Sequence, residues 1–175
     1  MNNTGWLLEG AIKDDQSVTP HWQPVQQQLI HGVVVKEVLH LLPAGGIMTE
    51  LYRKDWNTDA EDVDHVFART LDPGANSAWH AHALTRDRLF VLQGAARIVL
   101  YDSRPESPTC GAINQFRVGA LRPTLITVPQ KVWHAVQNIG PDTVLVVNMV
   151  SRAYQYADPD HYRLPADTPA IPFKF

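Results

Sequence analysis

The chain has 175 residues, of which 45% are hydrophobic, and a formal net charge of −3. This length and composition predict one globular domain with its own core and exclude a disordered chain. A slightly acidic chain with scattered arginines is expected to bind neither nucleic acid nor a membrane. The single cysteine, Cys110, excludes an intrachain disulfide. Because no signal-peptide pattern and no membrane-spanning apolar run are apparent, we expect a cytoplasmic protein.

Short apolar runs separated by turn residues dominate the chain. Residues 1–30 are expected to form an N-terminal arm or edge strand that can pair with a second subunit. Strands rich in branched and aromatic residues are then predicted at 33–42, 47–53, 65–71, 88–93, 95–101, 125–128, 132–137 and 143–150. Residues 156–175 contain four prolines and are expected to form an irregular tail packed on the barrel. No long stretch has helical periodicity. We therefore expect residues 31–155 to form an all-β sandwich or barrel.

A histidine pair and two later residues suggest a common site. His80 and His82 are two residues apart, so on a strand both imidazoles point to the same face. Asp87 follows five residues after His82, and His134 comes from a later predicted strand. A closed barrel can bring these side chains together. Three imidazoles and a carboxylate suit a divalent transition metal such as Fe, Mn, Ni or Zn.

Other interpretations of these residues stay open. A His-x-His pair is expected by chance roughly 0.4 times in such a chain, so both histidines can simply be hydrogen-bonded strand residues. Asp87 can form an ion pair with Arg86 or Arg88 instead of binding a metal. His65 lies on a predicted strand and can line the barrel. The remaining histidines have no partner at ligand spacing and are predicted to be surface or packing residues: His21, His31, His40 and His161.

Two stretches resemble the sequence motifs of the cupin superfamily. Residues 74–94 fit Gly-x5-His-x-His-x4-acid-x6-Gly, and residues 129–138 fit Pro-x-(Gly)-x2-His-x3-Asn. This resemblance implies a single jelly-roll β-barrel. It places four residues at the metal-ligand positions of the superfamily: His80, His82, Asp87 and His134. Asp87 stands where glutamate is usual, and Lys131 stands where the second motif has glycine.

A narrower resemblance covers about two thirds of the chain. Residues 102–111 read Asp-x-Arg-x-x-Ser-Pro-Thr-x-Gly, and Pro129 and His134 follow at matching distances. This pattern is similar to dTDP-4-dehydrorhamnose 3,5-epimerase, itself a cupin-type barrel. The resemblance implies a homodimer that acts on a small-molecule nucleotide sugar without a metal cofactor. It also implies catalytic roles for three residues: His80 as the base, Asp167 as its carboxylate partner and Tyr154 as a pocket acid.

The chain departs from the epimerase pattern at several positions. Ser77 and Ala78 replace an Arg-Gly pair, Asp87 replaces a lysine, and Asn148 replaces the tyrosine that donates the proton. These exchanges remove positive charge and add metal ligands, so the first prediction is a metal-binding cupin enzyme acting on a small carbonyl or sugar-derived substrate. One alternative is a metal-free nucleotide-sugar epimerase or ketoisomerase that uses His80 with Asp167. Another is a non-catalytic barrel that binds a small ligand.

Overall fold

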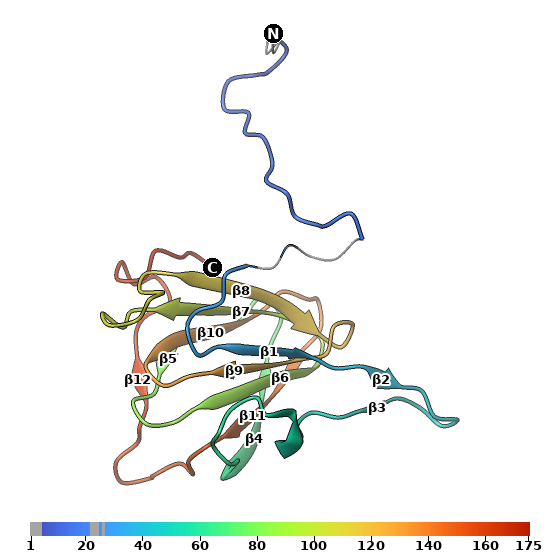
Figure 1. The fold of residues 1–175 in the computed structure, drawn as a ribbon, viewed down its shortest axis with the longest axis vertical. Coiled ribbons are helices and arrows are strands. Elements are labelled where there is room, and N and C mark those ends of the chain that lie inside the picture. Colours follow the sequence, from blue (N-terminus) through green and yellow to red (C-terminus); the bar gives the residue numbers. More distant parts are fainter. Residues whose placement is uncertain (1–4, 22–24, 26) are drawn as a thin grey trace.

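The computed structural model describes residues 5–21, 25 and 27–175, which form two five-stranded antiparallel sheets (Figure 1). One sheet has the order β1-β9-β6-β11-β4, and the other has the order β12-β5-β10-β7-β8. The strands are β1 Val34–Glu37, β2 His40–Leu41, β3 Met48–Thr49, β4 His65–Leu71, β5 Asn76–Ala81, β6 Asp87–Gln93, β7 Ala95–Asp102, β8 Ile113–Gly119, β9 Thr124–Val128, β10 Val132–Asn138, β11 Val144–Val150 and β12 Tyr162–Arg163. The one described helix is a 3-10 turn, η1, at Lys54–Trp56.

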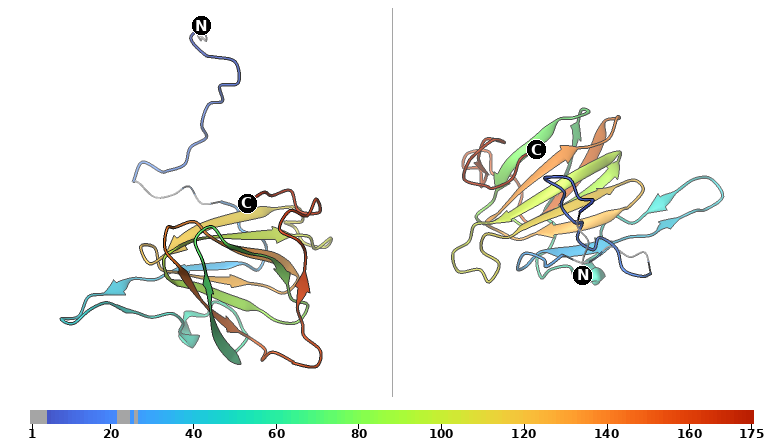
Figure 2. Two further views of the ribbon diagram at one scale, coloured as in Figure 1. Left: turned by 180° about the vertical axis from the view of Figure 1, so that it is seen from behind. Right: turned by 90° about the horizontal axis from the view of Figure 1, so that it is seen from above.

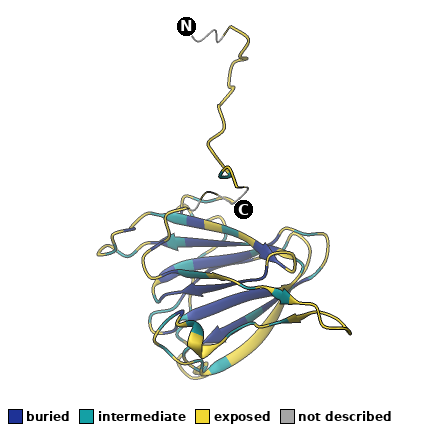
Figure 3. Ribbon diagram, turned by 45° about the vertical axis from the view of Figure 1, so that its right-hand side comes forward, coloured by how far each residue is buried: buried dark blue, intermediate teal, exposed yellow. Residues whose placement is uncertain are grey.

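The core lies between the two sheets, where apolar side chains alternate inward along each strand. Leu89 and Val91 on β6 meet Ile98 and Leu100 on β7, and all four are almost completely buried. This burial is the main source of stability, at about 25 cal/mol per Å² of apolar surface removed from water. Figure 3 shows the central strands buried along most of their length. The prediction of an all-β barrel is therefore confirmed.

The outer face of the second sheet is covered by the C-terminal tail. Trp79 on β5 is fully buried against Ile171, Phe173 and Phe175. Its ring centroid is 6.0 Å from that of Phe173, with the two rings nearly perpendicular. Such edge-to-face contacts add to the free energy of apolar burial. The tail thus fixes strand β5, which carries His80 and leads into His82, from the side opposite the barrel interior.

The motif at residues 102–111 stabilises the turn after β7. The buried Asp102 carboxylate accepts hydrogen bonds from Arg104, Ser107 and Thr109. A buried carboxylate requires such partners because desolvating an unpaired charge is costly. Residues 102–111 therefore have a structural role in this turn, and they do not line the main cavity of the barrel.

The observed strands differ from the predicted ones in several places, and β12 is also new. Strands β5 and β8 were not predicted as such, because their sequences contain few branched apolar residues. Asn114 on β8 is buried, and it accepts a hydrogen bond from the Ile30 amide. A polar residue thus occupies a buried position of β8, where an alternating apolar pattern would have an apolar residue. The predicted strand at 33–42 is divided, because the chain leaves the barrel after Glu37 and forms the β2–β3 hairpin. Only Met48–Thr49 of the predicted strand 47–53 is observed.

Two segments extend away from the barrel (Figure 2). Residues 5–21 run outward from it, and Trp6 is 78% exposed. The β2–β3 hairpin projects from another side and exposes Leu39 and Leu42. Pairing of the N-terminal segment with a second subunit, and the homodimer itself, stay predictions. Within the described part of the chain, no helix has the length and apolar character needed to cross a membrane.

Candidate active site

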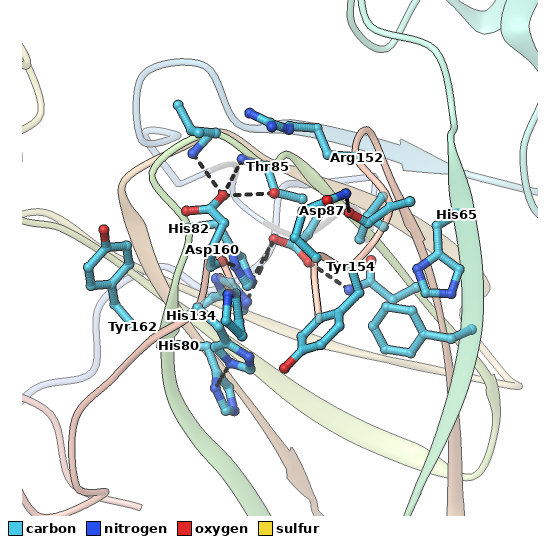
Figure 4. Close-up of a pocket in the computed structure, with 18 of the residues that line it drawn as sticks. His65, His80, His82, Thr85, Asp87, His134, Arg152, Tyr154, Asp160 and Tyr162 are labelled. Atoms are coloured by element: carbon cyan, nitrogen blue, oxygen red, sulfur yellow. Dashed lines mark hydrogen bonds and ion pairs between the residues drawn. The ribbon is translucent and has the colours of Figure 1, made fainter. Parts of the chain in front are cut away.

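A cavity of about 490 Å³ lies between the sheets, next to the apolar core. Strands β4, β5, β6, β10 and β11 form its walls, and residues 152–162 close one side. Figure 4 shows His80, His82 and His134 grouped on one side and His65 on the other. The prediction that His65 can line the barrel is confirmed. Half-exposed side chains such as Tyr154 also line the cavity, so it is open to solvent.

A β-bulge in β5 brings two polar side chains to the cavity wall. His80 pairs with His134 of β10, whereas Ser77 pairs with Val136, so two residues of β5 face one residue of β10. The extra residue breaks the alternation of faces. Ser77 and His80, three residues apart, therefore both line the cavity, and Trp79 points to the outer face.

His82, Asp87 and His134 form a compact cluster. The Nε2 atoms of His82 and His134 lie 3.5 and 3.9 Å from Oδ2 of Asp87. The other carboxylate oxygen of Asp87 accepts a hydrogen bond of 2.6 Å from Asn148. The Nδ1 atom of His134 is 3.2 Å from the Val132 carbonyl, and Nδ1 of His82 is bonded to the Asp160 carbonyl. Because a carbonyl only accepts, both rings carry their proton on Nδ1 when neutral, and both Nε2 lone pairs face Asp87.

This cluster has the donor set of a metal site. One ligand atom from each of its three residues lies within 4.8 Å of the other two. Two imidazole nitrogens and a carboxylate oxygen suit a divalent transition metal, so these three residues fit such an ion. His80, the fourth predicted ligand, is directed elsewhere. The structure therefore brings together three of the four predicted ligands.

His80 is held by two hydrogen bonds of its own. Its Nε2 atom is 2.8 Å from the Ser77 hydroxyl, and its Nδ1 atom is 2.7 Å from Nε2 of His161. The pKa of His80 is lowered to about 3. Burial is the main cause, and repulsion between the protonated His80 ring and the charges of His134, His161 and Arg163 contributes. Burial likewise lowers the pKa of His161 to about 4 and the pKa of His134. These three imidazoles are consequently neutral at pH 7, with lone pairs available.

His161 was predicted to be a surface or packing residue, and this prediction is wrong. It lines the cavity and contacts His80, from which it is separated by 81 residues. No local spacing signals such a contact. The neighbouring Asp160 was also missed. Its carboxylate accepts hydrogen bonds from the amides of residues 83–85 and from the Thr85 hydroxyl.

The structure does not bring Asp167 to His80. Asp167 is exposed in a turn of the C-terminal tail and does not line the cavity. Both ring nitrogens of His80 have other partners. The predicted His80–Asp167 pair is therefore absent from the described contacts, and His161 occupies the partner's place. Tyr154 does line the cavity, as the epimerase resemblance implied.

Charged residues around the site also differ from expectation. Arg88 does not pair with Asp87, because its buried side chain points away and binds Asp59 at 2.8 Å. Arg86 pairs instead with Glu61. Two arginines that the sequence motifs did not identify also line the cavity. They are Arg69 on β4 and Arg152, and both are exposed. An anionic ligand is therefore compatible with this cavity.

Comparisons with known proteins agree with the fold. A probable low-salt glycan biosynthesis epimerase, Agl13 of Haloferax volcanii, is 32% identical over 139 residues, which cover 79% of this chain and 89% of that protein. A dTDP sugar isomerase from Desulfovibrio desulfuricans superimposes with a TM-score of 0.77 and 27% identity, covering 83% of this chain and 91% of that one. The dTDP-4-dehydrorhamnose 3,5-epimerase from Bacillus anthracis, solved with TDP and PPi bound, gives a TM-score of 0.70 over 81% of this chain and 83% of that one. At 18% identity this last match shows the fold alone.

The cupin and epimerase resemblances of the sequence are thus confirmed at the level of the barrel. The family model of the polysaccharide biosynthesis C-terminal domain matches residues 44–162. This range includes every residue that lines the cavity. The chain therefore belongs to the polysaccharide biosynthesis C-terminal domain family, built on the same kind of cupin barrel as dTDP-4-dehydrorhamnose 3,5-epimerase.

Proposed function

We propose that this chain is a sugar epimerase that acts on a keto sugar linked to a nucleotide. The observation that carries the proposal is a single cavity lined by neutral imidazoles, two phenols and two arginines. The named activities of Agl13 and of the dTDP sugar isomerase support the same class of reaction. Of the functions predicted from the sequence, this proposal therefore adopts the metal-free epimerase rather than the metal-binding enzyme.

Epimerisation next to a keto group needs a base, a stabilised enolate and an acid on the opposite face. His80 is neutral at pH 7 and has an Nε2 lone pair that can accept the proton. The Ser77 hydroxyl that occupies this nitrogen must turn aside as the proton arrives. Two tyrosines, Tyr154 and Tyr162, line the cavity, and we assign the return of the proton to Tyr154. Formation of the enolate breaks one C–H bond, and reprotonation restores it with inverted configuration.

The two arginines are suited to the anionic part of such a substrate. Arg69 and Arg152 lie at exposed positions on the cavity wall, where a diphosphate can reach them without losing all its water. Guanidinium groups bind phosphate oxygens in a bidentate geometry. We therefore place the sugar near the imidazoles and the diphosphate toward the arginines.

Deuterium exchange tests this function. The protein is incubated in D₂O with a dTDP-linked 4-keto-6-deoxyhexose, and the sugar is followed by NMR. We expect deuterium at a carbon next to the keto group, and we expect His80→Ala to abolish the exchange. His40→Leu is the matched control, because His40 also has two hydrogen bonds but lies on β2, outside the cavity. Absence of exchange with both dTDP- and UDP-linked sugars, combined with tight dTDP binding, favours the non-catalytic alternative.

The His82–Asp87–His134 cluster favours a second candidate, a metal-dependent enzyme. Two Nε2 lone pairs and a carboxylate oxygen face one another, and this repulsive arrangement is relieved by a cation or a proton between them. A bound divalent metal would supply Lewis-acid polarisation of the keto oxygen. Calorimetric titration of chelator-treated protein with Zn²⁺ and Mn²⁺ tests this candidate. Binding that Asp87→Asn weakens by at least about tenfold supports the metal site, and absence of binding refutes it.

A further inference from the structure

Two consecutive residues, Asp160 and His161, contact His82 and His80 respectively, at the end of strand β5. The main-chain carbonyl of Asp160 accepts a hydrogen bond from Nδ1 of His82, and Nε2 of His161 bonds to Nδ1 of His80. In both cases the Nδ1 side of the ring is occupied. The Nε2 side is thereby directed toward Asp87 in one case and toward Ser77 in the other. One short segment thus orients both members of the histidine pair.

The backbone on both sides of His161 is fixed. Before it, the Asp160 carboxylate accepts four hydrogen bonds from residues 83–85. After it, Tyr162 and Arg163 form β12 and pair with Ala81 and His80. His161 is therefore held against β5 by sheet pairing and by a side-chain anchor. A ring fixed in this way can define the orientation of its neighbour.

We infer that His161 is the positioning residue of His80 in the proposed reaction. This inference rests on the proposed function and names a residue that lies outside the sequence motifs. The ring centroids of His80 and His161 are 4.8 Å apart, and one of their facing nitrogens donates a proton to the other in a hydrogen bond. When Nδ1 of His80 donates that proton, Nε2 keeps its lone pair for the Ser77 hydroxyl or for the substrate.

The inference explains how the site works without a carboxylate beside His80. An Asp partner would fix the tautomer of the base and also stabilise its protonated form. A neutral imidazole supports the same tautomer when its Nε2 atom accepts the hydrogen bond from Nδ1 of His80, but it adds no negative charge. His161 can pass a proton onward, because its ring is only partly buried and its Nδ1 atom can release a proton to solvent. The pair is therefore suited to a base that returns its proton to solvent between turnovers.

Two variants and two readouts test this role. His161→Leu removes the hydrogen bond, whereas His161→Gln keeps an amide that can reach Nδ1 of His80. Two-bond ¹H–¹⁵N spectra of histidine-labelled full-length protein report the tautomer of each ring independently of activity. We expect one tautomer of His80, with the proton on Nδ1, in the wild-type protein and in His161→Gln, and a mixture in His161→Leu. The His82 signals are an internal control, since a main-chain carbonyl fixes that ring.

Steady-state exchange with the dTDP-linked keto sugar provides the second readout. In His161→Leu we expect kcat to fall by about 30-fold or more, whereas KM should change by less than about threefold. In His161→Gln we expect kcat to be about tenfold higher than in His161→Leu. An unchanged His80 spectrum in His161→Leu overturns the inference, as does an unchanged kcat. If the wild-type protein exchanges no deuterium, the proposed function fails, whereas the His80 spectrum still decides whether His161 sets its tautomer.

Discussion

His80 and His134 lie directly opposite each other on neighbouring strands, yet only His134 directs its ring toward Asp87. His80 bonds to Ser77 and His161. The cavity consequently contains two neighbouring groups of side chains with separate chemistry. One is a carboxylate shared by His82 and His134, which suits a cation. The other is a hydrogen-bonded chain through His80, which suits proton transfer.

Replacing Asp167 with asparagine is expected to leave deuterium exchange within about twofold of the wild-type rate. Asp167 is exposed, and both ring nitrogens of His80 are bonded elsewhere. Initial rates of exchange with the dTDP-linked keto sugar measure this effect. A loss of 100-fold or more would restore Asp167 as the partner of His80 and would require the tail to rearrange when substrate binds.

Replacing Tyr154 with phenylalanine is expected to lower kcat by about 10²-fold, because the variant keeps the ring but loses the acidic hydroxyl. Incorporation of deuterium by proton abstraction should be affected less than formation of the epimerised product. NMR of the sugar separates these two outcomes. Tyr156→Phe is the matched control, since Tyr156 packs against Tyr154 but does not line the cavity. Equal effects of both variants would contradict an acid role for Tyr154.

Replacing Asp59 with asparagine is expected to lower the free energy of unfolding by about 3–5 kcal/mol, because it leaves the buried Arg88 charge without its carboxylate. Arg88 is fully buried and bonds to Asp59 and to the Met149 carbonyl. Urea denaturation measures the change. Asp55→Asn, which breaks an exposed pair with Arg53, should change stability by less than about 1 kcal/mol. Similar values for both variants would show that burial does not govern this ion pair.

Stability is expected to fall as the pH decreases below about 6.5, the ordinary pKa of histidine. The pKa values of His80 and His161 are lowered to about 3 and about 4 in the folded protein. Between these values and 6.5 the unfolded chain binds protons that the folded chain does not, so acidification favours unfolding. Denaturation at a series of pH values should show this slope, and His161→Gln should reduce it. A stability that stays constant from pH 7 to pH 5 would contradict the lowered pKa values.

The sequence by itself determined the class of fold and part of the site. Short runs of branched and aromatic apolar residues bounded by turn residues predict β6, β7, β9 and β11. The cupin-like spacing placed His82, Asp87 and His134 together, and the structure brings these three residues within ligand distance of one another. His82 follows β5 and His134 lies on the neighbouring β10, whereas Asp87 lies on β6 of the other sheet, so the packing of the two sheets completes the cluster.

Only the tertiary structure decided what His80 contacts. The bulge in β5 turns Ser77 to the same face as His80, and no residue pattern in the strand encodes that extra residue. His161 reaches His80 from 81 residues away, through a segment anchored by Asp160. A hydrogen bond between two ring nitrogens depends on positions known to a few tenths of an ångström. Sequence identifies the residue types in a cavity, whereas packing selects which of them face each other.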